Sequence, residues 1–208
     1  SSARIAHAAL ERFSSIVEPR TDGGFNIWEP TNILHRHRAD FARVFGLSPA
    51  KVRFIGTYVG GCFGNGADTL IPTGIAAMLA QKTGRPVKLA LSREEVFQDG
   101  STREPVIVHI KDGVKQDGTV IAREIKIIVH AGAYGGSMVQ VARTAAFGAV
   151  GTYRASNLKI DSYAVATNEP PASPFRGFGV AQLLWAVESH MDMLAAKLGM
   201  DPLELRMK

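Results

Sequence analysis

Residues 60–66 read Gly-Gly-Cys-Phe-Gly-Asn-Gly, and residues 174–179 read Pro-Phe-Arg-Gly-Phe-Gly. Each of these glycine-rich loops follows a β-like run and precedes an apolar run long enough to be a helix. Small residues at a helix N-terminus leave backbone N–H groups bare, and the helix dipole favours negative charge there. We therefore expect the two loops to bind the two ends of one polar, anionic cofactor. The alternative is that each glycine cluster is only a tight turn.

The glycine spacing does not match the common nucleotide-binding fingerprints. A Gly-x-Gly-x-x-Gly pattern that starts at Gly64 fails at Thr69, and one that starts at Gly177 fails at Gln182. No Lys-Ser or Lys-Thr pair follows the glycines, as a phosphate-binding P-loop requires. The loops therefore predict a ligand other than a dinucleotide bound in the Rossmann manner.

Side chains within and near the loops allow sharper hypotheses. Arg176 lies between two phenylalanines behind a proline-rich run, so we expect it to be held in place, where its five donors suit carboxylate, phosphate or oxo groups. The alternative is a structural arginine that caps carbonyl groups. Cys62 precedes a helix and has the position of an activated thiol, but a lone cysteine among glycines is more often a small packing residue. The run from His35 to Arg38 predicts a solvated basic face, because residues i and i+2 of a helix diverge too far to bind one metal.

Composition narrows the function classes. The chain has 208 residues, is 46% hydrophobic and carries a net charge of +5, which favours an anionic ligand and gives little support to nucleic acid binding. Its single cysteine excludes an internal disulfide, a CxxC zinc site and an iron–sulfur cluster bound within the chain. No apolar stretch approaches the ~20 residues that span a bilayer, and no signal pattern opens the sequence. We expect a cytoplasmic protein, with the periplasm as the alternative.

Periodicity predicts an α+β fold of mixed or antiparallel sheets with packed helices, because strands and helices do not alternate regularly. Asp117-Gly118 marks the turn of a β-hairpin, and Ser92 with Glu95 forms a capping box. Further strands are expected at 24–28, 51–55, 87–91 and 158–166, and the hairpin strands at 106–110 and 121–129. Helices are expected from Thr31 or Asn32 to Gly46, at 69–83, at 139–149, at 181–198 and from Asp201 onward. The helix at 69–83 is expected to carry on one side Ile71, Ile75, Met78 and Leu79. The helix at 181–198 is expected to have a core stripe of Leu184, Val187, Met191, Leu194 and Leu198.

Four stretches together resemble one protein family, the large molybdopterin-binding subunit of the xanthine dehydrogenase/aldehyde oxidase family of molybdenum hydroxylases. Residues 59–64 are similar to the family's V-G-G-G-F-G loop, with Cys62 in place of one glycine, and residues 174–182 to its A-F-R-G-F-G-x-x-Q loop. Residues 82–95 resemble the K-T-G-R-P-V-K…R-E-E segment. Residues 188–206 resemble the E-x-x-M-D…G-x-D-P-x-E-x-R pattern.

The resemblance implies a set of site residues. The positions that would surround the molybdenum and its pterin are Gly60, Gly61, Phe63, Gly64, Arg176, Gly177 and Phe178. Phe178 would also pack against the substrate, and Arg103 lies near the place of a substrate-orienting arginine. No side chain of the chain would ligate the metal directly. Ile5 stands where the family has a glutamine that contacts a metal ligand.

The same resemblance narrows the branch of the family. Gly177 stands where the carbon-monoxide-oxidising branch has its copper-binding cysteine, which argues against that branch. Gly66-Ala67-Asp68 replaces the Lys-Glu continuation of the first loop, which argues against a purine substrate. The family's glutamate base lies in a G-x-G-E-like motif that is not found here, so the segment alone is expected to be inactive.

We therefore expect residues 1–208 to be the first part of a molybdopterin-binding domain, with sub-lobes at about 1–91 and 92–208. The intact enzyme would insert a water-derived oxygen into a C–H bond of an aldehyde or an N-heterocycle. Its cofactor would be molybdopterin or the cytosine dinucleotide form. Iron–sulfur clusters and flavin would lie on partner subunits or domains, in an oligomeric enzyme without nucleic acid or a membrane span. The alternative is a noncatalytic anion-binding or assembly module that has lost the metal chemistry.

Overall fold

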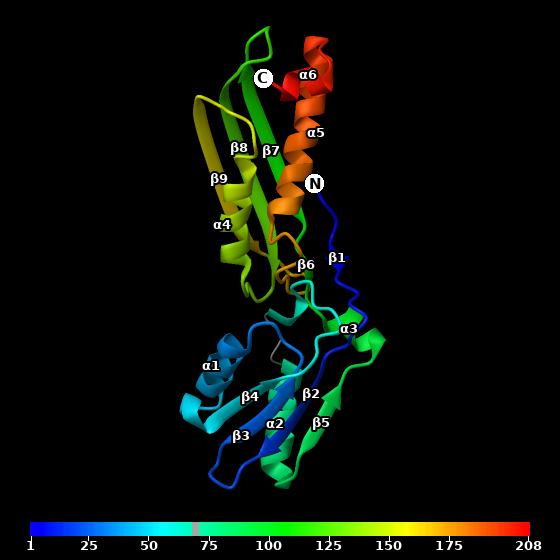
Figure 1. Cartoon of the computed structure of the whole chain (residues 1–208), viewed down its shortest axis with the longest axis vertical. Coiled ribbons are helices and arrows are strands. Elements are labelled where there is room, and N and C mark those ends of the chain that lie inside the picture. Colours follow the sequence, from blue (N-terminus) through cyan, green and yellow to red (C-terminus); the bar gives the residue numbers. More distant parts are fainter. Residues whose placement is uncertain (68–70) are drawn as a thin grey trace. The chain divides into compact units, whose positions relative to one another are not determined.

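The computed structural model describes residues 1–67 and 71–208, and the chain divides into two compact units (Figure 1). The first unit consists of Ala6–Ser101, and the second combines Ser1–Ile5 with Thr102–Lys208. Each unit has its own sheet and its own helices. No helix of the described residues is long and apolar enough to cross a lipid bilayer.

The first unit is built on a four-stranded mixed sheet in the order β4-β3-β2-β5. β2 pairs with β3 and with β5 in antiparallel fashion, whereas β3 and β4 are parallel. α1 lies in the connection between the parallel strands β3 and β4, and α2 packs on β2 and β5. The strands are β2 (Ser14–Pro19), β3 (Phe25–Glu29), β4 (Val52–Gly56) and β5 (Val87–Ala90), and the helices are α1 (Leu34–Val44), α2 (Ile71–Thr83) and α3 (Arg93–Asp99).

Small and aromatic side chains form the core of the first unit. Phe41 of α1 packs edge-on against Phe25 of β3, with ring centroids 5.6 Å apart. α2 buries its small residues instead of its large ones: Ala76, Ala77 and Ala80 are fully buried. The expected residues Ile71, Ile75, Met78 and Leu79 do share one side, but that side is 40–65% exposed. The alanines face the sheet because their small side chains let the helix backbone approach it closely. The expected start of this helix at Thr69 lies outside the described residues.

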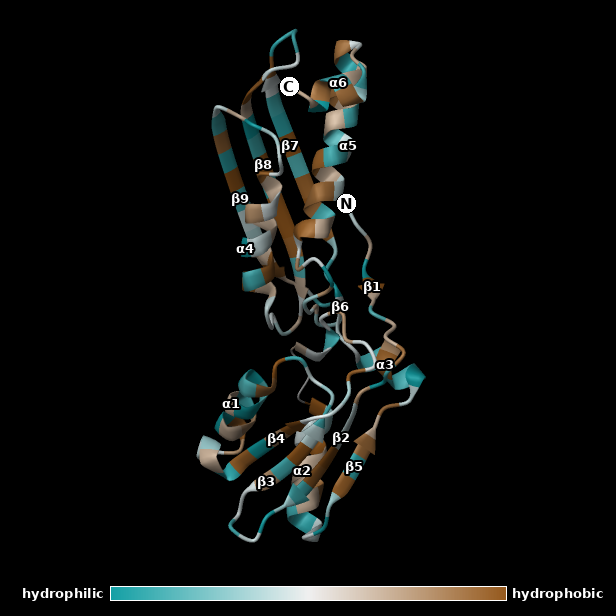
Figure 2. Ribbon diagram, in the orientation of Figure 1, coloured by the Kyte–Doolittle hydropathy of each residue, from teal (hydrophilic) through white to brown (hydrophobic). Residues whose placement is uncertain are grey.

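The second unit contains a three-stranded sheet in the order β7-β8-β9, with α4 and α5 packed on it. β7 and β8 form the expected antiparallel hairpin, and β9 runs parallel to β8. Apolar and polar residues alternate along these strands, visible as brown and teal bands in Figure 2. The elements are β6 (Thr102–Arg103), β7 (Val106–Val114), β8 (Val120–Gly132), β9 (Asn157–Ala166), α4 (Met138–Ala149), α5 (Val180–Leu198) and α6 (Pro202–Arg206), with β1 (Ile5–Ala6) paired to β6.

Two local predictions about the helices need correction. α5 buries Leu183, whereas the expected core residue Leu184 is 38% exposed; Val187 and Met191 are buried as expected. The buried stripe is therefore 183, 187, 191 and 195, one strict i, i+4 row. α1 begins after Ile33 with no side-chain cap, because the Thr31 hydroxyl accepts from the Ile33 amide instead of capping the helix.

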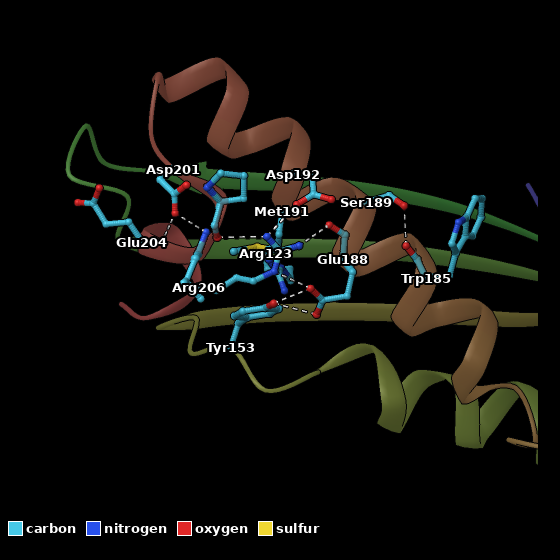
Figure 3. A network of polar contacts seen from close by, with 12 residues as sticks. Arg123, Tyr153, Trp185, Glu188, Ser189, Met191, Asp192, Asp201, Glu204 and Arg206 are labelled. Carbon is cyan, nitrogen blue, oxygen red and sulfur yellow. Dashed lines mark hydrogen bonds and ion pairs between the residues drawn. The ribbon is translucent and has the colours of Figure 1, made fainter.

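A buried ion pair joins the hairpin to α5 in the second unit. The Arg123 guanidinium donates to both carboxylate oxygens of Asp112, at 2.6 Å for the shorter Nη2–Oδ2 contact. It also approaches the Met191 sulfur of α5, and both residues are labelled in Figure 3. Both side chains are at most 2% exposed. Burial alone would raise the pKa of Asp112, but hydrogen bonds from His190 and Arg123 outweigh it and lower that pKa. Nearby, Glu188 accepts from the Tyr153 hydroxyl and pairs with Arg206 of α6.

We expect Arg123→Met to lower the free energy of unfolding by about 3–5 kcal/mol, because it removes the arginine that donates to both oxygens of the buried Asp112 carboxylate and leaves only His190 beside it. The exposed pair Lys159–Glu124 on the same sheet supplies the control, and Lys159→Met should cost less than ~1 kcal/mol. Urea denaturation followed through tryptophan fluorescence measures both.

The pH dependence of the same comparison follows from the lowered pKa of Asp112. The pair stabilises the protein above the pKa that Asp112 has in the unfolded chain, and this contribution disappears as pH falls through the folded pKa. The difference between wild type and Arg123→Met should therefore shrink in acid. If Arg123→Met and Lys159→Met lower the free energy of unfolding equally at neutral pH, the buried pair has no special stabilising role.

Candidate functional site

The first glycine-rich loop belongs to the first unit and follows β4. Its backbone is left-handed at three positions: φ is +111° at Gly61, +53° at Phe63 and +108° at Gly64. Glycine adopts such angles freely, but phenylalanine does so at a cost of roughly 1–2 kcal/mol. Strain of this kind persists only where the surrounding structure enforces it, and it concentrates at binding sites.

Contacts on both sides of the strained segment hold it in place. Glu11 binds Gly60 twice, since its carboxylate accepts from the Gly60 amide and its own amide donates to the Gly60 carbonyl oxygen at 3.2 Å. On the other side, the Cys62 carbonyl accepts from the Asn65 amide at 3.0 Å, and the Cys62 sulfur accepts from the Gly66 amide at 3.3 Å. The thiol thus takes part in the loop's own hydrogen bonding. The backbone N–H groups of residues 61–64 donate to no described residue.

The second glycine-rich loop, in the second unit, repeats this backbone pattern. It leads directly into α5, and φ is +96° at Gly177, +49° at Phe178 and +92° at Gly179. A Cβ atom at Gly179 would lie 2.8 Å from the Val141 carbonyl oxygen of α4, so only glycine fits there. Internal bonds close the turn, because the Phe178 amide donates to the Phe175 carbonyl at 2.7 Å. The amides of residues 176, 177 and 179 donate to no described residue.

Arg103, which the resemblance places near a substrate-orienting arginine, bonds the second loop in this structure. Its guanidinium donates to the Arg176 carbonyl oxygen at 2.7 Å and to Oε1 of Gln182 at 2.6 Å. It also lies over the Phe175 ring, 4.1 Å from the centroid, and the residue is only 9% exposed. The donors of Arg103 are thus directed at the loop backbone and at the first turn of α5.

Gln182 extends this contact to a buried acid. Its side-chain amide donates to Oε1 of Glu104 at 2.6 Å, while its oxygen accepts from Arg103. Glu104 is 1% exposed, and burial raises the pKa of its carboxyl group. Its other oxygen, Oε2, has no hydrogen-bond partner among the described residues. Arg103, Gln182 and Glu104, here called the loop clamp, therefore form a buried chain of polar groups beneath the loop. Sequence reasoning missed Gln182 and Glu104, whose only signal was their place in the A-F-R-G-F-G-x-x-Q and Arg-Glu-Pro stretches.

The exposed side chains of the two loops differ from what their sequences suggested. The expected fixed arginine, Arg176, is exposed, and its guanidinium forms no hydrogen bond or ion pair with another described residue. The Phe63 ring is 47% exposed. Phe178 is partly buried and packs against the core of its unit. Arg176 and Phe63 are therefore available to a ligand.

One further buried cluster in the first unit corrects the prediction of a solvated basic face at 35–38. His37 is 1% exposed, and its Nδ1 lies 2.7 Å from Oε1 of Glu29. Thr73 of α2 donates to the other Glu29 oxygen. The cluster joins β3, α1 and α2. Among the described residues, no group of three His, Cys, Asp or Glu side chains has the geometry of a metal site.

Each loop by itself offers hydrogen-bond donors that fit a cofactor carrying its own metal ligands. Both loops present amide N–H groups without acceptors among the described residues, and an exposed arginine adds a cation. Such groups hydrogen-bond oxo, thiolate and phosphate oxygen or sulfur atoms, which are the polar atoms of a molybdenum-bearing pterin. The glycines carry no side chains that would cover these amides.

Comparison with known proteins places the chain in a known family. A family model described as the molybdopterin cofactor-binding domain matches residues 1–208. A Bacillus subtilis protein, named as one subunit of a probable xanthine dehydrogenase, is 38% identical over 99% of this chain and 27% of its own length. The nicotinate dehydrogenase large molybdopterin subunit of Eubacterium barkeri is 33% identical over 98% of the chain and 48% of its own length.

A solved structure agrees with this grouping. The aldehyde oxidoreductase from Desulfovibrio gigas superimposes with a TM-score of 0.90 and 34% sequence identity, over 98% of this chain and 22% of that protein. The chain thus spans between about a fifth and a half of the length of these relatives.

The loop clamp yields a prediction for the second loop. Arg103→Met removes the donors to the Arg176 carbonyl and to Gln182, so the loop should open locally more often. We expect trypsin to cut after Arg176 several-fold faster than in the wild type, measured by mass spectrometry of limited digests. Cleavage after Arg154, an exposed arginine of the same unit, serves as the internal control and should not change. A parallel rise at both sites would mean general destabilisation and would contradict the clamp.

Proposed function

Because this chain belongs to the molybdopterin cofactor-binding domain family, we propose that its two Phe–Gly loops bind one molybdopterin cofactor within a longer oxidoreductase. The observation that carries the proposal is the repeated left-handed Phe–Gly backbone, +53° and +108° in one loop and +49° and +92° in the other. Each strained turn leaves amide N–H groups facing no described protein acceptor. Two turns built alike are suited to two polar parts of the same ligand.

We propose that the full-length protein oxidises an aldehyde or an N-heterocycle by placing a water-derived oxygen at a C–H bond. The names of the relatives, which include an aldehyde oxidoreductase and a nicotinate dehydrogenase, support both substrate classes. The bound cofactor would supply the two-electron redox chemistry. Residues 1–208 would form the first part of the cofactor-binding region, and the proton-accepting base would lie elsewhere in the protein.

The residues of this chain have distinct proposed roles in that reaction. The amides of residues 61–64 and of residues 176, 177 and 179 would stabilise negative charge on the cofactor, as preorganised N–H donors do in an oxyanion hole. Arg176, exposed and unpaired with any described residue, would bind an anionic group. Phe63 and Phe178 would exclude water and pack against the cofactor or the substrate. Arg103 would act through the loop, as a positioning residue.

Electron transfer would use groups outside this chain. Its single cysteine cannot bind an iron–sulfur cluster by itself, so we propose an iron–sulfur partner, and in some assemblies a flavin partner, as separate subunits or domains of an oligomeric enzyme. Both the Bacillus subtilis and the Eubacterium barkeri relative are named as single subunits, which supports a multi-subunit enzyme.

The first test of this function concerns the first loop. Gly61→Ala forces a side chain onto a residue with φ of +111°, where its Cβ would also lie 3.3 Å from the Phe63 ring. We expect the molybdenum content of the full-length protein to fall about tenfold or more, measured by mass spectrometry of the metal and by fluorescence of the released pterin. Released cytidine monophosphate would identify the dinucleotide form.

Gly23→Ala is the matched control, because it imposes similar backbone strain at φ of +79° in open space within the same unit. It should keep its molybdenum. If the unsubstituted full-length protein contains no molybdenum when produced with the cofactor pathway, the noncatalytic module is the better interpretation. Equal metal loss in both glycine variants would also contradict the proposed site.

The second test concerns Arg176. Since its side chain forms no hydrogen bond or ion pair with another described residue, Arg176→Ala should leave the free energy of unfolding unchanged within about 0.5 kcal/mol. Loss of a charge-assisted hydrogen bond of about 1.5–3 kcal/mol should lower turnover or cofactor retention roughly 10- to 100-fold. Arg154→Ala is the control, and turnover equal in the two variants would remove Arg176 from the site.

A further inference from the structure

A basic stretch of the first unit lies outside the glycine-rich loops. Residues 34–54 contain four arginines and one lysine but only one acidic residue, Asp40, so most of the chain's net charge of +5 is concentrated here. The stretch covers α1 and most of β4, which pack against each other, and β4 is an edge strand of its sheet (Figure 1). Like charges at such density repel one another and lower the stability of the fold, and an anionic ligand would offset them.

A pocket of about 360 Å³ lies among the residues of α1 and β4. Its ionisable lining residues are all basic, namely Arg20, His35, Arg38 and Arg53. Apolar residues line the rest, and the partly buried Phe54 is the largest of them. This volume lies in the range of roughly 300–1,000 Å³ that is usual for small-molecule sites. None of residues 60–66 lines the pocket, so it is distinct from the first glycine-rich loop.

The acidic side chains close to these basic residues in the sequence are already paired with other cations. Asp22 accepts from Arg20 at 2.9 Å and also lies 3.3 Å from the Lys51 amine. Asp40 pairs with two arginines of its own helix, at 3.5 and 3.2 Å, and neither aspartate lines the pocket. The charges of Arg38 and Arg53 are therefore not neutralised by an ion pair with any described carboxylate.

Several donor groups of the pocket have no acceptor. Arg38 is fixed in place, because its Nε and Nη2 atoms donate to the Pro49 carbonyl oxygen at 2.9 and 2.8 Å. Its Nη1 atom forms no hydrogen bond with a described residue. Arg53 and His35 are exposed, and neither forms a hydrogen bond or ion pair with a described residue. The pocket thus offers one oriented guanidinium and two further polar groups that can turn toward a ligand.

We propose that this pocket, here called the α1 pocket, binds a phosphate group carried by a small molecule. Arg38 and Arg53 donate to its oxygens, because guanidinium groups match phosphate in geometry and charge. A phosphate suits the pocket better than a carboxylate does, since its three free oxygens and its charge of about −2 engage both arginines together with His35. Leu34 and Phe54 offer an apolar surface for the organic part of a phosphate ester.

Isothermal titration calorimetry of the full-length protein in phosphate-free buffer tests the proposal. Inorganic phosphate and adenosine monophosphate should bind, and uncharged adenosine should not. Arg53→Gln should weaken the binding of both phosphates about tenfold or more, because it removes a charge-assisted donor. Arg85→Gln is the matched control and should leave both affinities unchanged, since Arg85 is an exposed arginine of the same unit that lies outside the pocket and pairs with no described residue. Thermal unfolding should be the same in the two variants.

The two phosphate probes separate the possible sources of the group. Tighter binding of adenosine monophosphate identifies an organic phosphate that uses the apolar surface, and equal binding identifies free phosphate. The proposal is overturned if neither probe binds, if both arginine variants weaken binding equally, or if adenosine binds as well as its monophosphate. Binding that is lost in Gly61→Ala but kept in Arg53→Gln would place the phosphate at the first glycine-rich loop, and would also overturn the proposal. None of these readouts depends on the molybdenum content.

Discussion

The left-handed backbone of Phe63-Gly64 and of Phe178-Gly179 is the constraint on which the account of this protein depends. Within the described residues, only three non-glycine residues have positive φ, and two of them are these phenylalanines. Neither turn would keep this conformation in isolation, because each costs free energy that the surroundings must offset. Glu11 supplies the restraint in the first unit by bonding Gly60 on both backbone groups. In the second unit, Arg103 fixes the Arg176 carbonyl, and the contact of Gly179 with α4 leaves no room for a side chain.

Buried polar groups give the second unit its specificity around this turn. The loop clamp of Arg103, Gln182 and Glu104 couples the loop to the first turn of α5, and the Arg123–Asp112 pair couples the far half of α5 to the hairpin. Such contacts contribute little net stability when complete, but they are costly when one member is missing. They therefore favour one orientation of α5, and with it one conformation of the loop at its N-terminus.

The sequence predicted the local features well and the long-range ones poorly. The hairpin around Asp117-Gly118 and the capping box of Ser92 and Glu95 are confirmed, since neighbouring residues determine both. α2 carries one stripe of large apolar residues and another of alanines, and only the distance to the sheet decides that the alanines are buried. His37 seemed solvated within a basic run, because its partner Glu29 lies on another element. Arg176 was expected to be held in place, whereas it is exposed. The arginine that bonds the second loop is Arg103, whose partner Gln182 lies 79 residues away in the sequence.

The family resemblance named the two loops, but the assignment of both loops to one ligand remains the central claim. A crystal structure of the full-length protein with its cofactor tests it most directly. The account predicts that amide nitrogens of residues 61–64 and of residues 176, 177 and 179 lie within hydrogen-bond distance of the same molybdenum–pterin group. A structure in which only one loop touches the cofactor, or in which the loops bind separate ligands, would contradict it.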